Sequence, residues 1–134
     1  MPDIVPTNAG GAGWEDWLWT AITTTDRKGA IQGANGQLVL PLHARKMIVV
    51  VEGTFGTGSP TILIEGSIVR ANPDTPVDSD FYQLDMADGN PAQVTAAGMM
   101  MILNSTYYVR PRLTGGDGTT DLNVRLMAAL PIRR

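Results

Sequence analysis

The sequence contains no cysteine and only one histidine, His43, among its 134 residues. Without cysteine, the chain cannot form a disulfide, a zinc–thiolate site, an iron–sulfur cluster or a thiol nucleophile. One histidine cannot build a histidine-rich metal site. We therefore expect no metal and no cofactor, and we interpret His43 as a surface or hydrogen-bonded side chain.

Charged residues are also sparse, at 17% of the chain with a net charge of −3. A nucleic-acid-binding protein normally carries a basic face or stripe, whereas the ten basic residues here are scattered. No segment approaches the roughly 18 apolar residues of a membrane-spanning helix. We expect neither a nucleic-acid nor a membrane partner. Low charge suits a protein that covers its surface with neighbours, although many monomeric β-proteins share this composition.

Recognisable catalytic motifs are absent too. No serine lies in the G-x-S-x-G turn that exposes a nucleophile, and GTFGTG lacks the Lys-Ser/Thr of a phosphate-binding loop. A group of aspartates could supply paired carboxylates for glycoside hydrolysis or calcium ligands, but its spacing matches neither use. We interpret that group as a solvated loop, Asp117 as an Asx-turn residue, and the protein as a non-enzyme. The grouped aspartates are Asp74, Asp78, Asp80, Asp85 and Asp88.

The sequence does contain short runs rich in β-branched residues, separated by turns with many of its 15 glycines and 9 prolines. Leu122, Val124 and Leu126 alternate with polar residues, as in a strand with one buried face. Pro111 lies inside a run and predicts an edge or bulged strand. The expected strands are Trp17–Thr25, Met47–Phe55, Thr61–Arg70, Phe81–Met86, Met99–Leu103, Tyr107–Leu113 and Leu122–Leu126.

These strands and their Gly-rich connections predict an all-β fold, specifically a single antiparallel β-sandwich, jelly-roll-like. Residues 14–134 form the sandwich domain in this prediction. Residues 1–13 offer almost nothing to bury and are expected to form a flexible N-terminal arm. Met47–Phe55 is apolar on both alternate sets over its first half, which is typical of a strand covered on two faces. Met86 and Met99–Met101 are interpreted as adaptable core filler.

All three tryptophans lie in the segment WEDWLW, residues 14–19. Alternation puts Trp17 and Trp19 on one strand face with Ala21, and Leu18, Thr20 and Ile22 on the other. Trp14 precedes the expected strand, so it is a candidate anchor to a neighbour. The paired arginines are either solvated or bound to an acidic partner through the planar guanidinium. The candidate partner contacts are Trp14, Trp17, Arg110, Arg112, Arg133 and Arg134.

Several motifs together resemble a family of small tailed-bacteriophage virion proteins with a β-sandwich fold. The family carries a G-T-F-G turn, an I-E-G-S strand, a T-A-A-G turn, and a Y-x-R-P-R strand that leads into a Gly-rich turn and a last alternating strand. The chain departs from the pattern after Ser67, where a longer, proline-bearing loop replaces a short turn. The matching segments are Gly53–Gly56, Ile64–Ser67, Thr95–Gly98, Tyr108–Arg112 and Gly115–Leu126, within Trp19 to Met127.

The resemblance implies a structural role, in which the protein binds the major capsid protein on the outer capsid surface and cements neighbouring capsomers. It also implies a homotrimer, located on the virion and, during assembly, in the host cytoplasm. An alternative is a carbohydrate- or receptor-binding β-sandwich module of a phage tail or fibre. That alternative predicts an exposed aromatic platform, with Trp14, Trp17, Tyr107 and Tyr108 as its candidates. An enzyme that uses the carboxylates of Asp74–Asp88 is the third possibility.

Overall fold

The structure is a computed structural model, and it describes residues 7–8, 14–25, 32–33, 36–37, 46–67, 81–103 and 108–129. Within these ranges every regular element is a β-strand, and every strand pairing is antiparallel. The prediction of an all-β antiparallel fold is confirmed. The finer assignment to a single jelly-roll-like sandwich stays a prediction.

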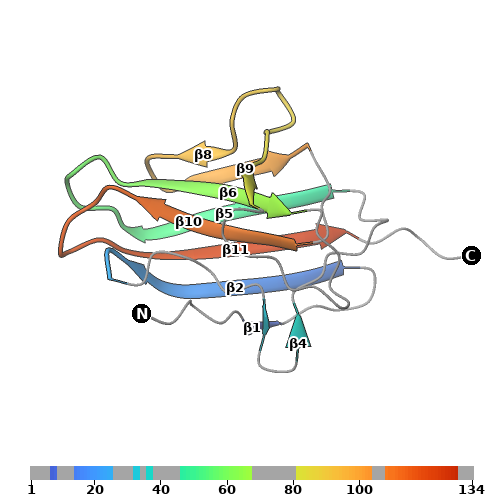
Figure 1. Cartoon of the computed structure of the whole chain (residues 1–134), viewed down its shortest axis with the longest axis horizontal. Helices are drawn as coiled ribbons and strands as arrows, with labels where there is room; N and C mark the ends of the chain where they lie inside the picture. The colour runs from blue at the N-terminus through green and yellow to red at the C-terminus, as the bar shows by residue number, and fades with distance from the viewer. Residues whose placement is uncertain are drawn as a thin grey trace, which may run out of the picture.

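Two sheets contain most of the strands (Figure 1). The larger sheet has the order β1-β2-β11-β5-β9, which is Thr7–Asn8, Trp14–Thr23, Asp121–Ala129, Lys46–Thr54 and Gly98–Ile102. The smaller sheet has the order β10-β6-β7, which is Tyr108–Thr114, Thr61–Ser67 and Tyr82–Gln83, and β8 (Gln93–Val94) also pairs with β6. A separate pair joins β3 (Gln32–Gly33) to β4 (Gly36–Gln37). As Pro111 predicts, β10 is an edge strand among the described strands.

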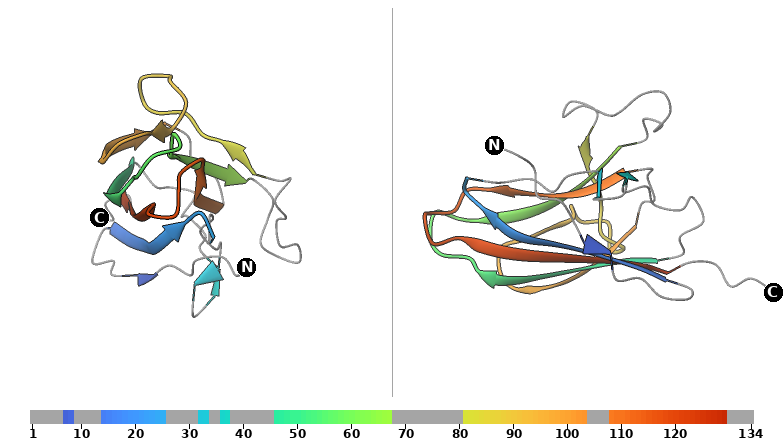
Figure 2. Two further views of the ribbon diagram at one scale, coloured as in Figure 1. Left: turned by 90° about the vertical axis from the view of Figure 1, so that its left-hand side faces the viewer. Right: turned by 90° about the horizontal axis from the view of Figure 1, so that it is seen from below.

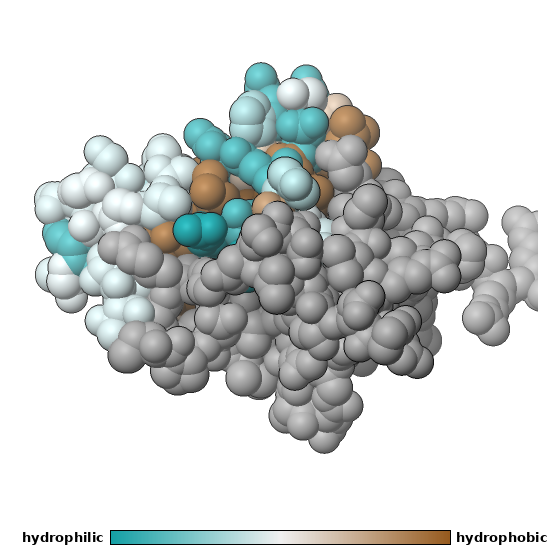
Figure 3. Space-filling model, viewed as in Figure 1, coloured by the Kyte–Doolittle hydropathy of each residue, from teal (hydrophilic) through white to brown (hydrophobic). Residues whose placement is uncertain are grey.

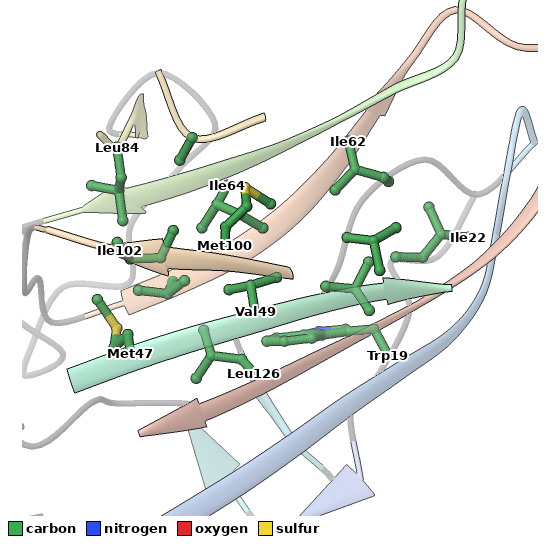
Figure 4. Close-up of a cluster of buried hydrophobic side chains, with 14 of the residues drawn as sticks. Trp19, Ile22, Met47, Val49, Ile62, Ile64, Leu84, Met100, Ile102 and Leu126 are labelled. Atoms are coloured by element: carbon green, nitrogen blue, oxygen red, sulfur yellow. The ribbon is translucent and has the colours of Figure 1, made fainter. Parts of the chain in front are cut away.

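The hydrophobic core lies between the two sheets (Figure 4). Alternate residues of each long strand point into it, because successive side chains of a strand face opposite sides. Trp19, Val49 and Leu126 come from the larger sheet, and Ile62 and Ile64 come from the smaller one. The other buried members are Ile22, Met47, Val51, Leu84, Ala92, Met100, Ile102, Val109, Leu113, Leu122, Val124 and Ala128.

A β-bulge changes the facing of β2 near its end. Leu122 and Val124 of β11 pair with Ile22 and Trp19, so two residues of β2 oppose the single residue Asn123. Ala21 has a φ of 55° there, and the extra residue reverses the alternation. Ile22 is therefore fully buried, and the expectation that it faces away from Trp19 is wrong. In the sequence, the bulge shows only as a shift in the apolar alternation between Trp19 and Ile22.

Residues 84–92 form a hairpin that connects the two sheets. At its base, the Leu84 N–H donates to the Ile64 carbonyl (2.9 Å), and the Ile64 N–H donates to the Ala92 carbonyl (3.0 Å). Farther out, the Ala87 N–H donates to the Met101 carbonyl at 2.8 Å. The hairpin thus leaves β6 in the smaller sheet and pairs with β9 at the edge of the larger one. The expected strand Phe81–Met86 is consequently limited to Tyr82–Gln83.

Candidate interaction surface

The face of the larger sheet that points away from the core is the main candidate surface, and we call it the outer face. Strand register defines its rows. Leu18, Arg125, Val50 and Met99 are successive partners across β2, β11, β5 and β9. Asp16, Met127, Ile48 and Met101 form the next row, and Asn123 pairs with Glu52 on the other side. These ten residues are the outer face.

Apolar side chains of the outer face are incompletely covered. Met99 is 70% exposed and Met101 is 45% exposed, whereas Met100 between them is buried in the core. Interpreting all three methionines as core filler is therefore wrong, because β9 alternates across a sheet whose far side is open. The other apolar members, Leu18, Ile48, Val50 and Met127, are partly exposed.

A shallow hollow of about 340 Å³ lies on the outer face. Leu18, Val50 and Met127 supply its apolar lining. Glu52, Asn123 and Arg125 supply its polar lining. Three apolar and three polar side chains thus line the hollow, and Arg125 lies between Leu18 and Val50 within it.

The charges of the outer face differ in their partners. Arg125 is half exposed, and its Nε lies 3.5 Å from Oδ1 of the buried Asp16. That oxygen accepts no hydrogen bond from the described residues. Glu52 is exposed and makes no ion pair with the described residues. Arg125, which is paired with Asp16, and Glu52, which is unpaired among the described residues, thus lie on adjacent strands of an otherwise mostly apolar face.

Further exposed hydrophobic residues lie in the segment that contains the hairpin. Tyr82 is 72% exposed and Leu103 is 58% exposed. Figure 3 shows hydrophobic surface (brown) beside hydrophilic residues (teal) in the upper part of the view, where Figure 1 draws the yellow and orange segments. Tyr82 belongs to β7, and Leu103 follows β9, so the two do not belong to one strand.

At one end of the molecule, two of the connections between the sheets lie side by side, and we call this end the tip. Residues 55–60 join β5 to β6, and residues 115–120 join β10 to β11 (Figure 2, left). The Gly116 N–H donates to the Gly58 carbonyl at 2.9 Å. A Cβ on Gly58 would lie 2.5 Å from the Gly116 carbonyl oxygen. Glycine is therefore required there for the two turns to approach.

The Asp117 carboxylate holds the tip together. Its Oδ2 accepts from the Thr57 N–H (2.9 Å) and hydroxyl (2.6 Å), and its Oδ1 accepts from the Thr119 N–H (2.8 Å) and hydroxyl (2.6 Å). The hydroxyls of Thr119 and Thr57 and the two backbone donors hold the pKa of Asp117 well below its usual range. The Asx-turn interpretation of Asp117 is confirmed, and the carboxylate also bridges to the second turn.

Two of the predicted partner contacts are placed differently by the structure. Trp17 pairs with Leu126, and its side chain packs partly buried against the core, so it is not a free contact. Arg110 is only 3% exposed, because its Nε contacts Glu65 Oε1 at 3.1 Å and its guanidinium lies 3.9 Å from the centre of the Phe81 ring. The prediction of a solvated or partner-bound arginine could not show that Phe81 covers Arg110.

Of the other predicted contacts, one is exposed, one belongs to a strand, and the rest lie outside the described residues. Arg112 remains partly exposed, with its Nη1 3.7 Å from Glu65 Oε2. Trp14 was expected to precede the strand. It is instead the first residue of β2, and it pairs with Ala129. Thr7 and Asn8 of the expected arm form β1 and pair with β2. Arg133, Arg134 and Tyr107 lie outside the described residues.

Catalytic or metal-binding constellations are not found among the described residues. No group of three or more acidic or histidine side chains in them could hold a metal ion. Asp88 accepts from the Asn90 N–H at 2.9 Å and stabilises the hairpin turn. His43, Asp74, Asp78 and Asp80 lie outside the described residues. In the part of the chain that is described, no helix has the length and apolar character to span a bilayer.

Sequence reasoning missed the outer face as a site. Its signals were nevertheless present, since MIVVV is apolar on both sides of a strand and MMMI places two methionines opposite a buried one. The sequence did not predict that Glu52 and Arg125 are neighbours, because they belong to segments far apart in the chain. Only the register of β5 and β11 brings them together.

Comparisons with known proteins give little further information. No family model and no curated protein matches the chain. One solved structure, protein NMB1881 from Neisseria meningitidis, aligns over 96% of this chain and 86% of its own length, with 11% identity and a TM-score of 0.35. A similarity at that level carries no argument about fold or function.

Proposed function

We propose that this protein is a structural protein of a tailed-phage virion, which binds the outer capsid surface and cements neighbouring capsomers. The observation that carries the proposal is the exposed guanidinium of Arg112 on the edge strand β10, which belongs to the smaller sheet and not to the outer face. An exposed arginine at a sheet edge suits a contact with a partner surface that carries carboxylates. The protein would then act by binding alone, without catalysis.

The family resemblance supplies the rest of the proposal. Its implied partner is the major capsid protein, its implied state is a homotrimer, and its implied location is the virion. A decoration protein gains strength from many weak contacts made together, because each copy must lose several before a capsomer can leave. Arg112 is the described candidate for a capsid contact, since its guanidinium is partly exposed beside Glu65 and can bind an acidic surface.

Co-pelleting with capsids tests this function. Purified protein is mixed with capsids of the source phage that lack it, and binding is measured as protein per capsid after sedimentation. We expect saturable binding, and weaker binding of Arg112→Glu. Gln93→Glu, which changes another exposed side chain of the smaller sheet, is the matched control. A lack of saturable co-pelleting by the wild-type protein would refute the capsid role.

The carbohydrate-binding alternative depends on exposed aromatic side chains. Among those of the described residues, Trp19 and Phe81 are buried and Trp17 and Phe55 pack against the core. Tyr82 is the largely exposed one among the aromatic side chains whose exposure is described. The candidates Trp14, Tyr107 and Tyr108 lie outside that set, so the platform stays a prediction. A positive glycan array that Tyr82→Ala abolishes would favour this alternative.

A further inference from the structure

The outer face is apolar at its centre because β5 carries apolar side chains on both sides. Val49 and Val51 are fully buried in the core, whereas Ile48 and Val50 point outward and are partly exposed. A strand with two apolar faces is typical of a sheet that is covered on both sides. On the outer side of β5, the described residues cover these apolar side chains only in part.

We propose that a second copy of this chain covers the outer face, related to the first by a twofold axis. The charges support this partner. Arg125 on β11 and Glu52 on β5 carry opposite charges on one face. Glu52 has no ion-pair partner among the described residues. A twofold axis that lies in the plane of the contact makes a face meet itself, so a residue pair that the axis exchanges meets twice. Two symmetrical Arg125–Glu52 ion pairs then form between the copies.

The strand register places apolar residues on the same axis. Val50 pairs with Arg125, Glu52 lies two residues farther along β5, and Met99 pairs with Val50. With strands about 4.8 Å apart and alternate residues about 6.8 Å apart, the in-plane axis that exchanges Arg125 and Glu52 passes about 1.4 Å from the positions of Val50 and Met99. Val50 and Met99 therefore pack against the other copy close to the ion pairs.

The area of the outer face determines how strong a dimer contact we expect. Four strands and three rows of side chains have a projected area on the order of 400 Å². A stable interface usually buries about 800 Å² per partner, so the contact should be a weak, concentration-dependent dimer. This arrangement is separate from the threefold one implied by the family resemblance, and it is tested without any capsid.

Charge reversal tests the twofold contact. Glu52→Arg brings a new arginine of each copy to Arg125 of the other, and Arg125→Glu brings a new carboxylate of each copy to Glu52 of the other. Each variant alone should therefore associate about tenfold or more weakly than wild type. In a one-to-one mixture, the new arginine of one variant meets the new glutamate of the other, while one native Glu52–Arg125 pair is retained. We expect the mixture to regain association, which sedimentation velocity from low micromolar to submillimolar concentration measures.

Folding of the variants must be separated from their association. Arg125→Glu places a second carboxylate beside Asp16, so the double variant Asp16→Asn/Arg125→Glu serves as the alternative partner in the mixture. Circular dichroism verifies the fold of each protein. Wild type that stays monomeric at submillimolar concentration, or that forms trimers which do not pair further, overturns the proposal. Folded variants that associate like wild type alone, or whose mixture does not recover association, also overturn it.

Discussion

Strands β5 and β11 contribute to both the tip and the outer face, yet their exposed groups are paired within the chain at the tip and incompletely covered on the outer face. At the tip, the turns that leave β5 and enter β11 satisfy each other through Asp117, two threonines and close glycine contacts. On the outer face, the same strands present Val50 and Ile48 to solvent and leave Glu52 without an ion-pair partner among the described residues.

The exposed groups of the tip are satisfied by folding alone, whereas the apolar area of the outer face needs a partner to cover it. Polar groups at the tip are paired within the chain, so binding has little to add there. Apolar area on the outer face remains exposed, and its removal from water is worth about 25 cal/mol per Å². Changes at the tip should therefore affect stability, and changes on the outer face should affect association.

The largest effect is expected from Gly58→Ala at the tip. Gly58 has a φ of +79°, and an added Cβ would meet the backbone oxygen of Gly116 at 2.5 Å. Both the left-handed backbone and the clash oppose a side chain, so we expect a loss of about 3 kcal/mol in the free energy of unfolding. Urea denaturation followed by circular dichroism measures this loss.

Two other glycines provide matched controls for that prediction. Gly89 has a φ of +88° but open space around it, so Gly89→Ala should cost only about 1 kcal/mol. Gly118 has open space and no left-handed φ, so Gly118→Ala should change stability by less than about 0.5 kcal/mol. Equal losses of stability for Gly58→Ala and Gly89→Ala would show that the two turns of the tip, residues 55–60 and 115–120, do not pack closely.

Met99 and Met100 test the two sides of the larger sheet on neighbouring positions of one strand. Met100 is 2% exposed within the core, so Met100→Ala should destabilise by about 3 kcal/mol. Met99 points outward, so Met99→Ala should change stability by less than about 0.5 kcal/mol while it weakens self-association. Comparable destabilisation by both substitutions would mean that the outer face is already covered within one chain.

The sequence pattern predicted the strands better than it predicted their surroundings. Alternation in Leu122, Val124 and Leu126 depends only on one strand having a dry and a wet side, and the structure confirms it. Burial of Arg110 depends on Phe81, which is 29 positions away in the chain and approaches only through tertiary packing. The bulge at Ala21 and the Glu52–Arg125 proximity likewise depend on register between distant strands.

Acid should weaken the tip through Asp117. Because its four hydrogen bonds favour the carboxylate, the folded state holds the pKa of Asp117 well below the ordinary value of about 4. The unfolded chain therefore binds the proton more readily, so this stabilisation is complete above that ordinary value and is lost as the pH falls toward the lowered pKa. Asp117→Asn should reduce stability at pH 7 and remove this part of the acid dependence.

Urea unfolding at several pH values between 7 and 3 measures the contribution of Asp117. Asp121→Asn is the control, since Asp121 is also an exposed carboxylate near the same end of β11. The wild type and Asp121→Asn should lose more stability in acid than Asp117→Asn does. Parallel acid dependence in all three proteins would show that the hydrogen bonds of Asp117 do not stabilise the fold.

The smallest effect on stability is expected from Glu52→Gln on the outer face. The substitution keeps the size of the side chain and removes only a charge that has no ion-pair partner in the described part of the chain. The free energy of unfolding, measured at a concentration where the protein is monomeric, should therefore change by less than about 0.5 kcal/mol. Self-association should weaken several-fold, because each dimer loses two symmetrical ion pairs with Arg125 while the Val50 and Met99 contacts remain. A clear loss of monomer stability would instead place Glu52 in a contact within its own chain and would remove the charge argument for the twofold dimer.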